Sequence, residues 1–185
     1  AAIMLMCFSL LKAGDHVLYS QSMFGSTIKL IGTEFARFGV ESTCVPQTDL
    51  PAWKAAIRPN TRLLFAETPT NPLTEVCDIA ALADLAHEAG ALLAVDNCFA
   101  TPSLQRPTEL GADIVMHSGT KYLDGQGRVM AGALCANEQL VNEIAGLGLE
   151  ISTGLQTYLG EQGMGPVGAQ AATGIGAGMA ENGTP

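Results

Sequence analysis

Helix-length and strand-length apolar segments alternate along most of this chain, and this alternation constrains the fold more than any other feature. The expected helices cover residues 1–13, 26–38, 49–57 and 78–89. The expected strands cover residues 16–20, 40–45, 62–67, 92–95, 113–117 and 129–136. Strands and helices that alternate in this way are typical of a mostly parallel sheet with helices on both faces. The sequence therefore predicts an α/β fold.

Local signals mark the ends of these helices. Asp49 and Asp78 precede helical segments, where an aspartate side chain accepts hydrogen bonds from the first free backbone N–H groups. Gly14, Gly39 and Gly90 follow helical segments, where glycine commonly ends a helix. The expected order of helices and strands thus rests on local signals as well as on the apolar pattern.

A change of composition separates residues 1–142 from residues 143–185. No Lys or Arg follows Arg128, and the second segment holds 11 of the 21 glycines without a fixed period. Because such a segment has little to bury, we expect a folded domain over 1–142 and a loosely ordered tail over 143–185. Residues 163–168 match the Gly-x-Gly-x-x-Gly spacing of a dinucleotide-binding loop, but no convincing strand precedes them and the match is weak.

Charge and cysteine content argue against several kinds of function. With 9 basic and 18 acidic residues, the net charge of −9 argues against a nucleic-acid or anionic-membrane partner. The five cysteines are scattered without a C-x-x-C pair, so we expect no metal site, no disulfide framework, and reduced thiols in a cytoplasmic protein. The apolar run 1–11 is too short to span a bilayer and is expected to be a buried helix.

Polar and aromatic residues follow four of the expected strands. In open parallel sheets, ligands bind beyond the carboxyl ends of the strands, where loops present polar groups without disturbing the core. The candidates are Phe24, residues 67–72, Asp96 with Asn97, and residues 118–121. We expect these loops to converge on one site.

Lys121 is the candidate for covalent chemistry. A lysine just after a buried strand can form an imine with an aldehyde cofactor, while Ser118, Thr120 and backbone amides hold its phosphate. Asp96 ends a strand 25 residues earlier, and a carboxylate there can keep a pyridine nitrogen protonated so that the ring accepts electrons. The ordinary alternatives stay open, because a loop lysine is usually solvated and an aspartate at a strand end usually caps a turn.

Residues 113–127, Asp-Ile-Val-Met-His-Ser-Gly-Thr-Lys-Tyr-Leu-Asp-Gly-Gln-Gly, resemble the lysine signature of the Cys/Met-metabolism family of pyridoxal-phosphate enzymes. The other landmarks occur in the order of that family, at residues 14–17 with 24–27, then 67–72, then 95–99. The family includes cystathionine synthases and lyases, methionine γ-lyase and homoserine sulfhydrylases. The resemblance covers residues 1–142 and implies part of the large cofactor-binding domain of a fold-type I, aminotransferase-like enzyme, with pyridoxal 5′-phosphate as cofactor.

The resemblance also implies roles for the residues around the lysine. Lys121 would be the Schiff-base lysine and would move protons on the substrate. Asp96 would be the partner of the pyridine nitrogen. Ser118 and Thr120 would contact the phosphate.

Two further positions match family residues on other loops. Phe24 stands where many relatives have a tyrosine that stacks on the cofactor ring, so the resemblance implies stacking without a phenolic proton donor. Asn71 would approach the phenolic oxygen of the cofactor. The plain alternatives are ordinary core packing for Phe24 and a turn before Pro72 for Asn71.

The substrate is indicated by finer similarities within the family. Residues 24–27 and 122–132 are similar to the members that act on O-succinylhomoserine. That similarity implies a transferase of methionine biosynthesis that replaces the γ-substituent of a small amino-acid substrate with sulfide and forms homocysteine. The γ-lyase and cystathionine γ-synthase reactions of the same transsulfuration family stay open.

The resemblance begins just after the Ser-Gly-Met phosphate loop of the family. The N-terminal arm and the C-terminal domain that binds the substrate carboxylate also have no counterpart in the 185 residues. Full-length relatives are homodimers or homotetramers with sites shared between subunits. We therefore expect these residues alone to be an inactive fragment.

Overall fold

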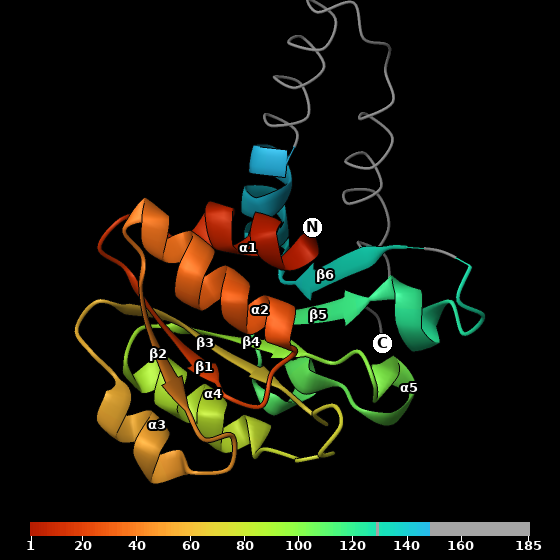
Figure 1. Cartoon of the computed structure of the whole chain (residues 1–185), viewed down its shortest axis with the longest axis horizontal. Helices are drawn as coiled ribbons and strands as arrows, with labels where there is room; N and C mark the ends of the chain where they lie inside the picture. The colour runs from red at the N-terminus through yellow and green to blue at the C-terminus, as the bar shows by residue number, and fades with distance from the viewer. Residues whose placement is uncertain (129, 149–185) are drawn as a thin grey trace, which may run out of the picture.

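The computed structural model describes residues 1–128 and 130–148, and within them six strands form one sheet in the order β2-β1-β3-β4-β5-β6 (Figure 1). The strands are β1 (His16–Ser20), β2 (Glu41–Val45), β3 (Thr61–Glu67), β4 (Leu92–Asp96), β5 (Ile114–Ser118) and β6 (Gly132–Ala136). Strands β1 to β5 pair in parallel, whereas β6 is antiparallel to β5. The predicted mostly parallel α/β sheet is confirmed.

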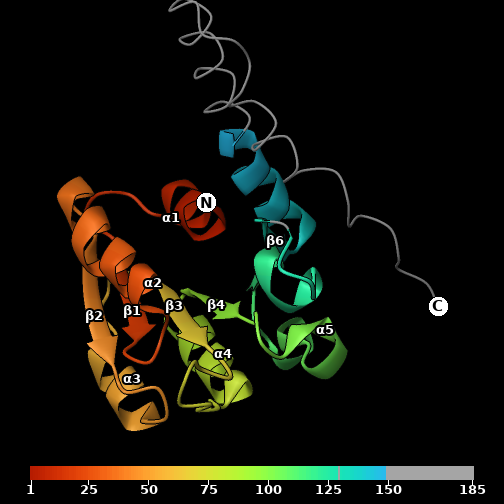
Figure 2. The same ribbon diagram turned by 45° about the vertical axis from the view of Figure 1, so that its right-hand side comes forward.

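Helices cover both faces of this sheet (Figures 1 and 2). Their bounds are α1 (Ala2–Leu10), α2 (Gly25–Lys29), η1 (Leu30–Glu34), η2 (Phe35–Phe38), α3 (Leu50–Ala56), α4 (Ile79–Glu88), α5 (Thr101–Leu104), η3 (Pro107–Leu110) and η4 (Gly119–Leu123). Side chains alternate along a strand, so Leu63 and Phe65 pack toward α1 and η2, while Leu64 packs toward α3 and α4. The core is therefore divided by the sheet into two layers.

The predicted caps hold the two helices on the second face. Asp49 accepts a hydrogen bond from the Ala52 N–H at 2.9 Å, and Asp78 accepts one from the Ala81 N–H at 3.0 Å. Each bond satisfies a backbone donor that has no partner within the helix. Both predicted N-caps are confirmed.

The predicted helix over 26–38 is helical but is not one regular α-helix. It passes from α2 through the π-helical η1 to the 3-10 helix η2. Gly32 lies so close to β1 that an added Cβ would be 2.8 Å from the Tyr19 hydroxyl oxygen. We attribute the local change of helical pitch to this close approach of the helix to the sheet.

Most expected bounds lie within one residue of the structure, but two elements are shorter than expected and one expected loop is partly helical. The first helix ends at Leu10, and the last strand begins at Gly132. The expected loop between β4 and β5 contains α5 and η3, and Pro102 and Pro107 stand at their first turns. Proline fixes a helical φ there, so each turn starts locally without the longer apolar pattern that reveals a full helix.

Residues 138–148 form a further helix that packs beside α1 (Figure 2). Its Leu140 joins the same core layer as Met6 of α1. The expected boundary at residue 142 therefore falls inside a helix, while residues 149–185, including the match at 163–168, lie outside the described residues. No helix in the described ranges is long and apolar enough to cross a bilayer.

Candidate active site

Strands β3, β4 and β5 end at the same edge of the sheet, and their last residues are polar. Glu67 of β3 is in register with Asp96 of β4, and Asp96 is in register with Met116 of β5. Both carboxyl groups are buried, with Glu67 2% and Asp96 5% exposed. Two acidic side chains thus lie next to each other at the edge where the sequence predicts a site.

Asp96 is a buried carboxyl group without a cationic partner. Its Oδ1 accepts a hydrogen bond from the Cys98 N–H at 3.0 Å, and no ion pair joins it to a basic side chain in the described part of the chain. Burial raises the pKa of Asp96, although the hydrogen bonds from Cys98 lower it. A cation at this carboxylate would offset the desolvation of its charged form. The protonated ring nitrogen of pyridoxal phosphate fits this requirement.

Cys98 links Asp96 to the turn that carries the lysine. The Ser118 N–H donates to Cys98 Sγ at 2.7 Å, and the Cys98 N–H donates to Asp96. Lys121 follows in the π-helical turn η4, where it is exposed. The structure therefore gathers Asp96, Ser118 and the lysine turn at one edge.

The hydroxyl groups of this turn remain able to donate hydrogen bonds. Thr120 Oγ1 accepts the Ala131 N–H at 3.2 Å, which leaves its own hydroxyl hydrogen for another acceptor. Ser118 is half-buried at the end of β5. Hydroxyl hydrogens suit the oxygens of a phosphate group, so this side of the site also fits pyridoxal phosphate.

Phe24 presents an exposed ring at the start of α2. Phe24 as a whole residue is 58% exposed, so its ring is not packed in the core. The Phe24 N–H donates to Glu67 Oε2 at 2.7 Å. Asn71 is also exposed, in the loop after β3 and before Pro72. The structure thus anchors Phe24 to the strand edge, while no side-chain contact of Asn71 with the lysine turn is described.

Sequence reasoning assigned no role to Glu67, which the structure makes the best-connected acid of this edge. The pKa of Glu67 is raised to about 7, mainly by burial; the backbone hydrogen bond from Phe24 opposes this rise, the charge of Asp96 adds to it, and a backbone hydrogen bond from Asn71 also opposes it. The signal available in the sequence was that two of the expected strands end at acidic residues, Glu67 and Asp96. Two parallel strands that end in acidic residues bring those residues together.

Glu67→Gln is expected to remove a pH-dependent loss of stability. A raised carboxyl pKa means that the folded chain keeps a proton that the unfolded chain releases, so stability is lost as pH rises from 4.5 toward 7. The loss corresponds to about 3 kcal/mol at most. Urea unfolding at pH 5 and pH 8 should show a large difference for the wild type and a smaller one for Glu67→Gln. The exposed Glu88→Gln is the matched control, and equal pH dependence in wild type and Glu67→Gln would contradict the assignment.

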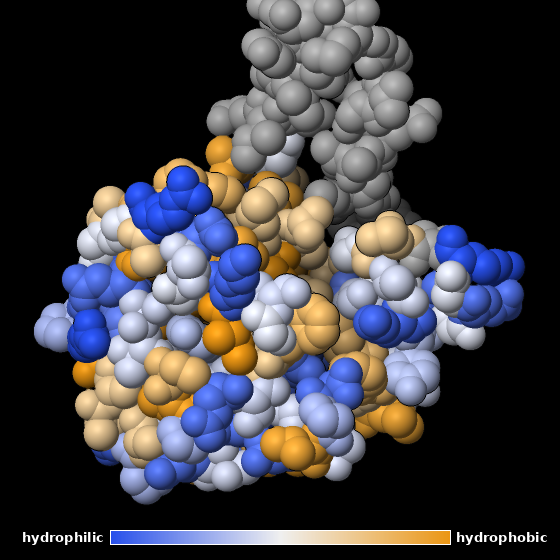
Figure 3. Space-filling view, in the orientation of Figure 1, coloured by the Kyte–Doolittle hydropathy of each residue, from blue (hydrophilic) through white to orange (hydrophobic). Residues whose placement is uncertain are grey.

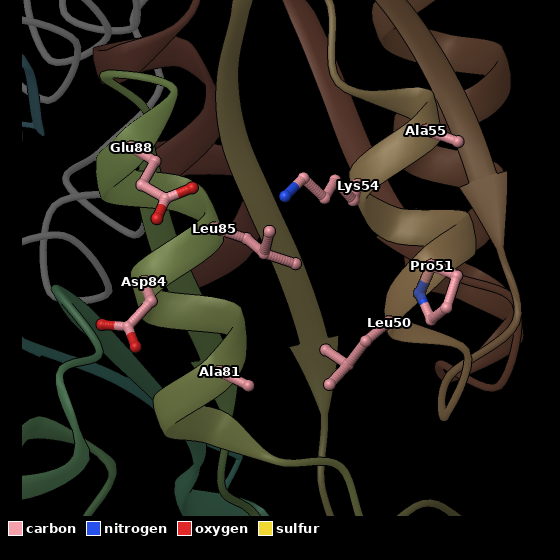
Figure 4. Close-up of a pocket in the computed structure, with 8 residues that line it drawn as sticks. All are labelled: Leu50, Pro51, Lys54, Ala55, Ala81, Asp84, Leu85 and Glu88. Carbon is pink, nitrogen blue, oxygen red and sulfur yellow. The ribbon is translucent and has the colours of Figure 1, made fainter.

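A separate groove lies between α3 and α4 (Figure 4). Its lining residues come from these two helices and are Leu50, Pro51, Lys54, Ala55, Ala81, Asp84, Leu85 and Glu88. None of them is a predicted site residue, and the groove lies between the helices rather than at the strand ends. It is therefore not the candidate active site. The described residues also contain no cluster of three or more His, Cys, Asp or Glu side chains suited to a metal ion.

A mostly parallel sheet with a buried aspartate and a lysine turn at its carboxyl edge is the framework of a pyridoxal-phosphate-dependent α/β enzyme. The family model described as "Cys/Met metabolism PLP-dependent enzyme" matches residues 1–169. Because this match covers most of the 185 residues, the chain belongs to that family. The match extends past residue 142, where the resemblance seen in the motifs ends.

Individual relatives agree with this assignment. The O-succinylhomoserine sulfhydrylase of Pseudomonas aeruginosa is 56% identical over 146 residues, which are 79% of this chain and 36% of the relative. The cystathionine γ-synthase of Mycobacterium bovis is 47% identical over 135 residues, or 73% of this chain and 35% of the relative. A crystal structure of cystathionine γ-lyase from Lactobacillus plantarum complexed with L-serine superposes with a TM-score of 0.73 and 42% identity, covering 77% of this chain and 38% of that chain. The chain thus spans little more than a third of the length of these proteins.

Proposed function

We propose that this chain is the cofactor-binding part of a pyridoxal-phosphate enzyme that replaces the succinyloxy group at Cγ of O-succinylhomoserine with sulfide. The observation that carries the choice of reaction is the 56% identity to a sulfhydrylase, against 47% to a γ-synthase. The products would be homocysteine and succinate. Because the chain spans only part of its relatives, the reaction is proposed for a family member of full length that contains these residues.

The residues of the proposed cofactor site come from four loops, which follow β1, β3, β4 and β5. When bound, pyridoxal phosphate supplies an aldehyde for covalent attachment and a ring that takes up electrons from the substrate. Asp96 holds a proton on the ring nitrogen, and its burial without a basic partner supports this role. Ser118 and Thr120 bind the phosphate, Phe24 covers one face of the ring, and Asn71 approaches the phenolic oxygen.

Lys121 is the proposed proton carrier of the reaction. Its exposed amine, released when the substrate amine takes its place, accepts the proton from Cα and transfers protons at Cβ. The Cγ–O bond then breaks with departure of succinate. A Cγ–S bond forms with sulfide, whose proton is released, and Lys121 returns a proton to Cα. One flexible side chain can carry out each proton transfer, because the turn that bears Lys121 is held in place at Ser118.

Product analysis tests the choice of reaction. With O-succinylhomoserine and sulfide, a full-length protein that contains this chain should form homocysteine and succinate in equal amounts. With the same substrate and cysteine, the rate should be lower by about tenfold, which corresponds to about 1.4 kcal/mol of preference. Oxobutyrate and ammonia as main products would favour a γ-lyase, and faster reaction with cysteine would favour a cystathionine γ-synthase. Either outcome would overturn the sulfhydrylase proposal.

The second candidate is an inactive fragment. This candidate is favoured because the match covers only part of the length of each relative, 36% in the case of the sulfhydrylase. For the 185 residues alone we therefore propose cofactor binding without turnover.

Location and assembly are proposed from the state of the cysteines and from the exposed apolar surface. All five cysteines are free, in agreement with a reducing cytoplasm. Hydrophobic residues are exposed over α1, where Met4 is 46% and Phe8 is 38% exposed (Figure 3). An apolar surface of this kind supports assembly into a homo-oligomer.

A further inference from the structure

Two carboxyl groups at and after the end of β3 hold the segment between β1 and α2. The Ser22 hydroxyl donates to Glu75 Oε2 at 2.5 Å, and the Phe24 N–H donates to Glu67 Oε2 at 2.7 Å. Ser22 is also fixed within the segment, because its N–H donates to Ser20 Oγ at 3.0 Å. The segment is therefore attached at two points, one on β3 and one on the loop that follows β3.

The backbone of Phe24 is fixed on both sides. Its N–H is bound by Glu67, and its carbonyl oxygen accepts the N–H groups of Thr27 at 2.8 Å and Ile28 at 3.2 Å. The side chain is nevertheless 58% exposed. The position of the ring is thus set by the backbone while its faces stay accessible, which is the arrangement that a ligand-contacting side chain needs.

Glu67 makes this attachment from a position that is costly for folding. It is 2% exposed, and its titratable neighbours Asp96 and Cys98 offer no positive charge. A buried acid in such surroundings destabilises the folded chain unless it stays protonated.

We propose that Glu67 is a positioning residue for the cofactor, which acts through the Phe24 N–H to direct the Phe24 ring onto the face of the pyridine ring. The inference rests on the proposed function, because it requires pyridoxal phosphate at the edge formed by Asp96 and Lys121. In this proposal Glu67 does not itself contact the cofactor. The effect of Glu67 on cofactor binding should therefore depend on Phe24.

A double-mutant cycle with pyridoxal phosphate and the 185-residue chain tests this dependence. Phe24→Ala and Glu67→Leu are each expected to weaken binding about tenfold, the first by loss of stacking and the second by loss of the acceptor. Glu67→Gln keeps an acceptor oxygen and should bind within about threefold of the wild type. In the Phe24→Ala background, Glu67→Leu should weaken cofactor binding by less than about a further twofold. Additive losses in the double variant would overturn the proposal, because Glu67 would then act by another route.

A measurement on the wild type keeps the test valid if Glu67→Leu does not fold. The ring proton resonances of Phe24, identified by comparison with Phe24→Leu, should shift when pyridoxal phosphate is added. Unshifted ring resonances at saturation would overturn the inference. Failure of the proposed cofactor site is distinguishable, because the wild type would then show no visible band from a cofactor attached to Lys121, whereas a different choice of reaction would leave the band and this test unchanged.

Discussion

Lys121→Ala is expected to abolish the visible absorbance band that forms when pyridoxal phosphate binds to this chain. The band requires covalent attachment to an amine, and Lys121 is the one lysine at the edge formed by β3, β4 and β5 within the described residues. The remaining amplitude at saturating cofactor should be below about a tenth of the wild-type value, since attachment to solvated amines is weak. A spectrophotometric titration measures both amplitude and affinity.

Lys54→Ala is the matched control for this experiment. Lys54 is also an exposed lysine, but it lies on α3 beside the groove between α3 and α4 (Figure 4). Its replacement should leave the amplitude unchanged. An equal loss of the band in both variants would mean that the chain reacts with the aldehyde through surface amines in general, without a specific site.

Asp96→Asn is expected to weaken the binding of pyridoxal phosphate about 100-fold. The substitution removes the charged partner of the ring nitrogen, and loss of one member of a buried charged pair costs about 3 kcal/mol. The free chain should not be destabilised to the same degree. Asp96 has no basic partner among the described residues, and asparagine removes a charge that burial disfavours.

Asp84→Asn, an exposed substitution on α4, provides the comparison for Asp96→Asn. It should change neither affinity nor thermal stability. If Asp96→Asn bound the cofactor as tightly as Asp84→Asn, the ring nitrogen would not be in contact with Asp96. If Asp96→Asn lowered the melting temperature strongly in the absence of cofactor, the aspartate would serve mainly to hold the fold.

The predictable parts of the fold were those that depend on neighbours in the sequence. The helix caps at Asp49 and Asp78 follow from a side chain and an N–H group three residues apart. The antiparallel direction of β6 depends on the path of the chain after the lysine turn, which no local pattern encodes. The irregular pitch around Gly32 depends on contact with Tyr19 of a neighbouring strand, so it also lies beyond a pattern of apolar residues.

In the candidate site, too, the features that depend on local sequence could be predicted and those that depend on distant contacts could not. Asp96 and Lys121 could be named because parallel strands present their following residues at one edge, and the structure places both there. The connection between them through Cys98 could not be predicted, since it depends on a hydrogen bond from Ser118 to a sulfur 20 residues away. The pairing of Glu67 with Asp96 required the register of β3 on β4, which the sequence leaves open.

Reductive trapping with borohydride tests the central claim most directly. The chain has four lysines, at positions 12, 29, 54 and 121, so peptide mapping by mass spectrometry assigns the trapped cofactor to one of few amines. We expect the pyridoxyl group on Lys121 alone when pyridoxal phosphate is equimolar with the chain. A label spread over the other lysines, or absent from Lys121, would contradict the account.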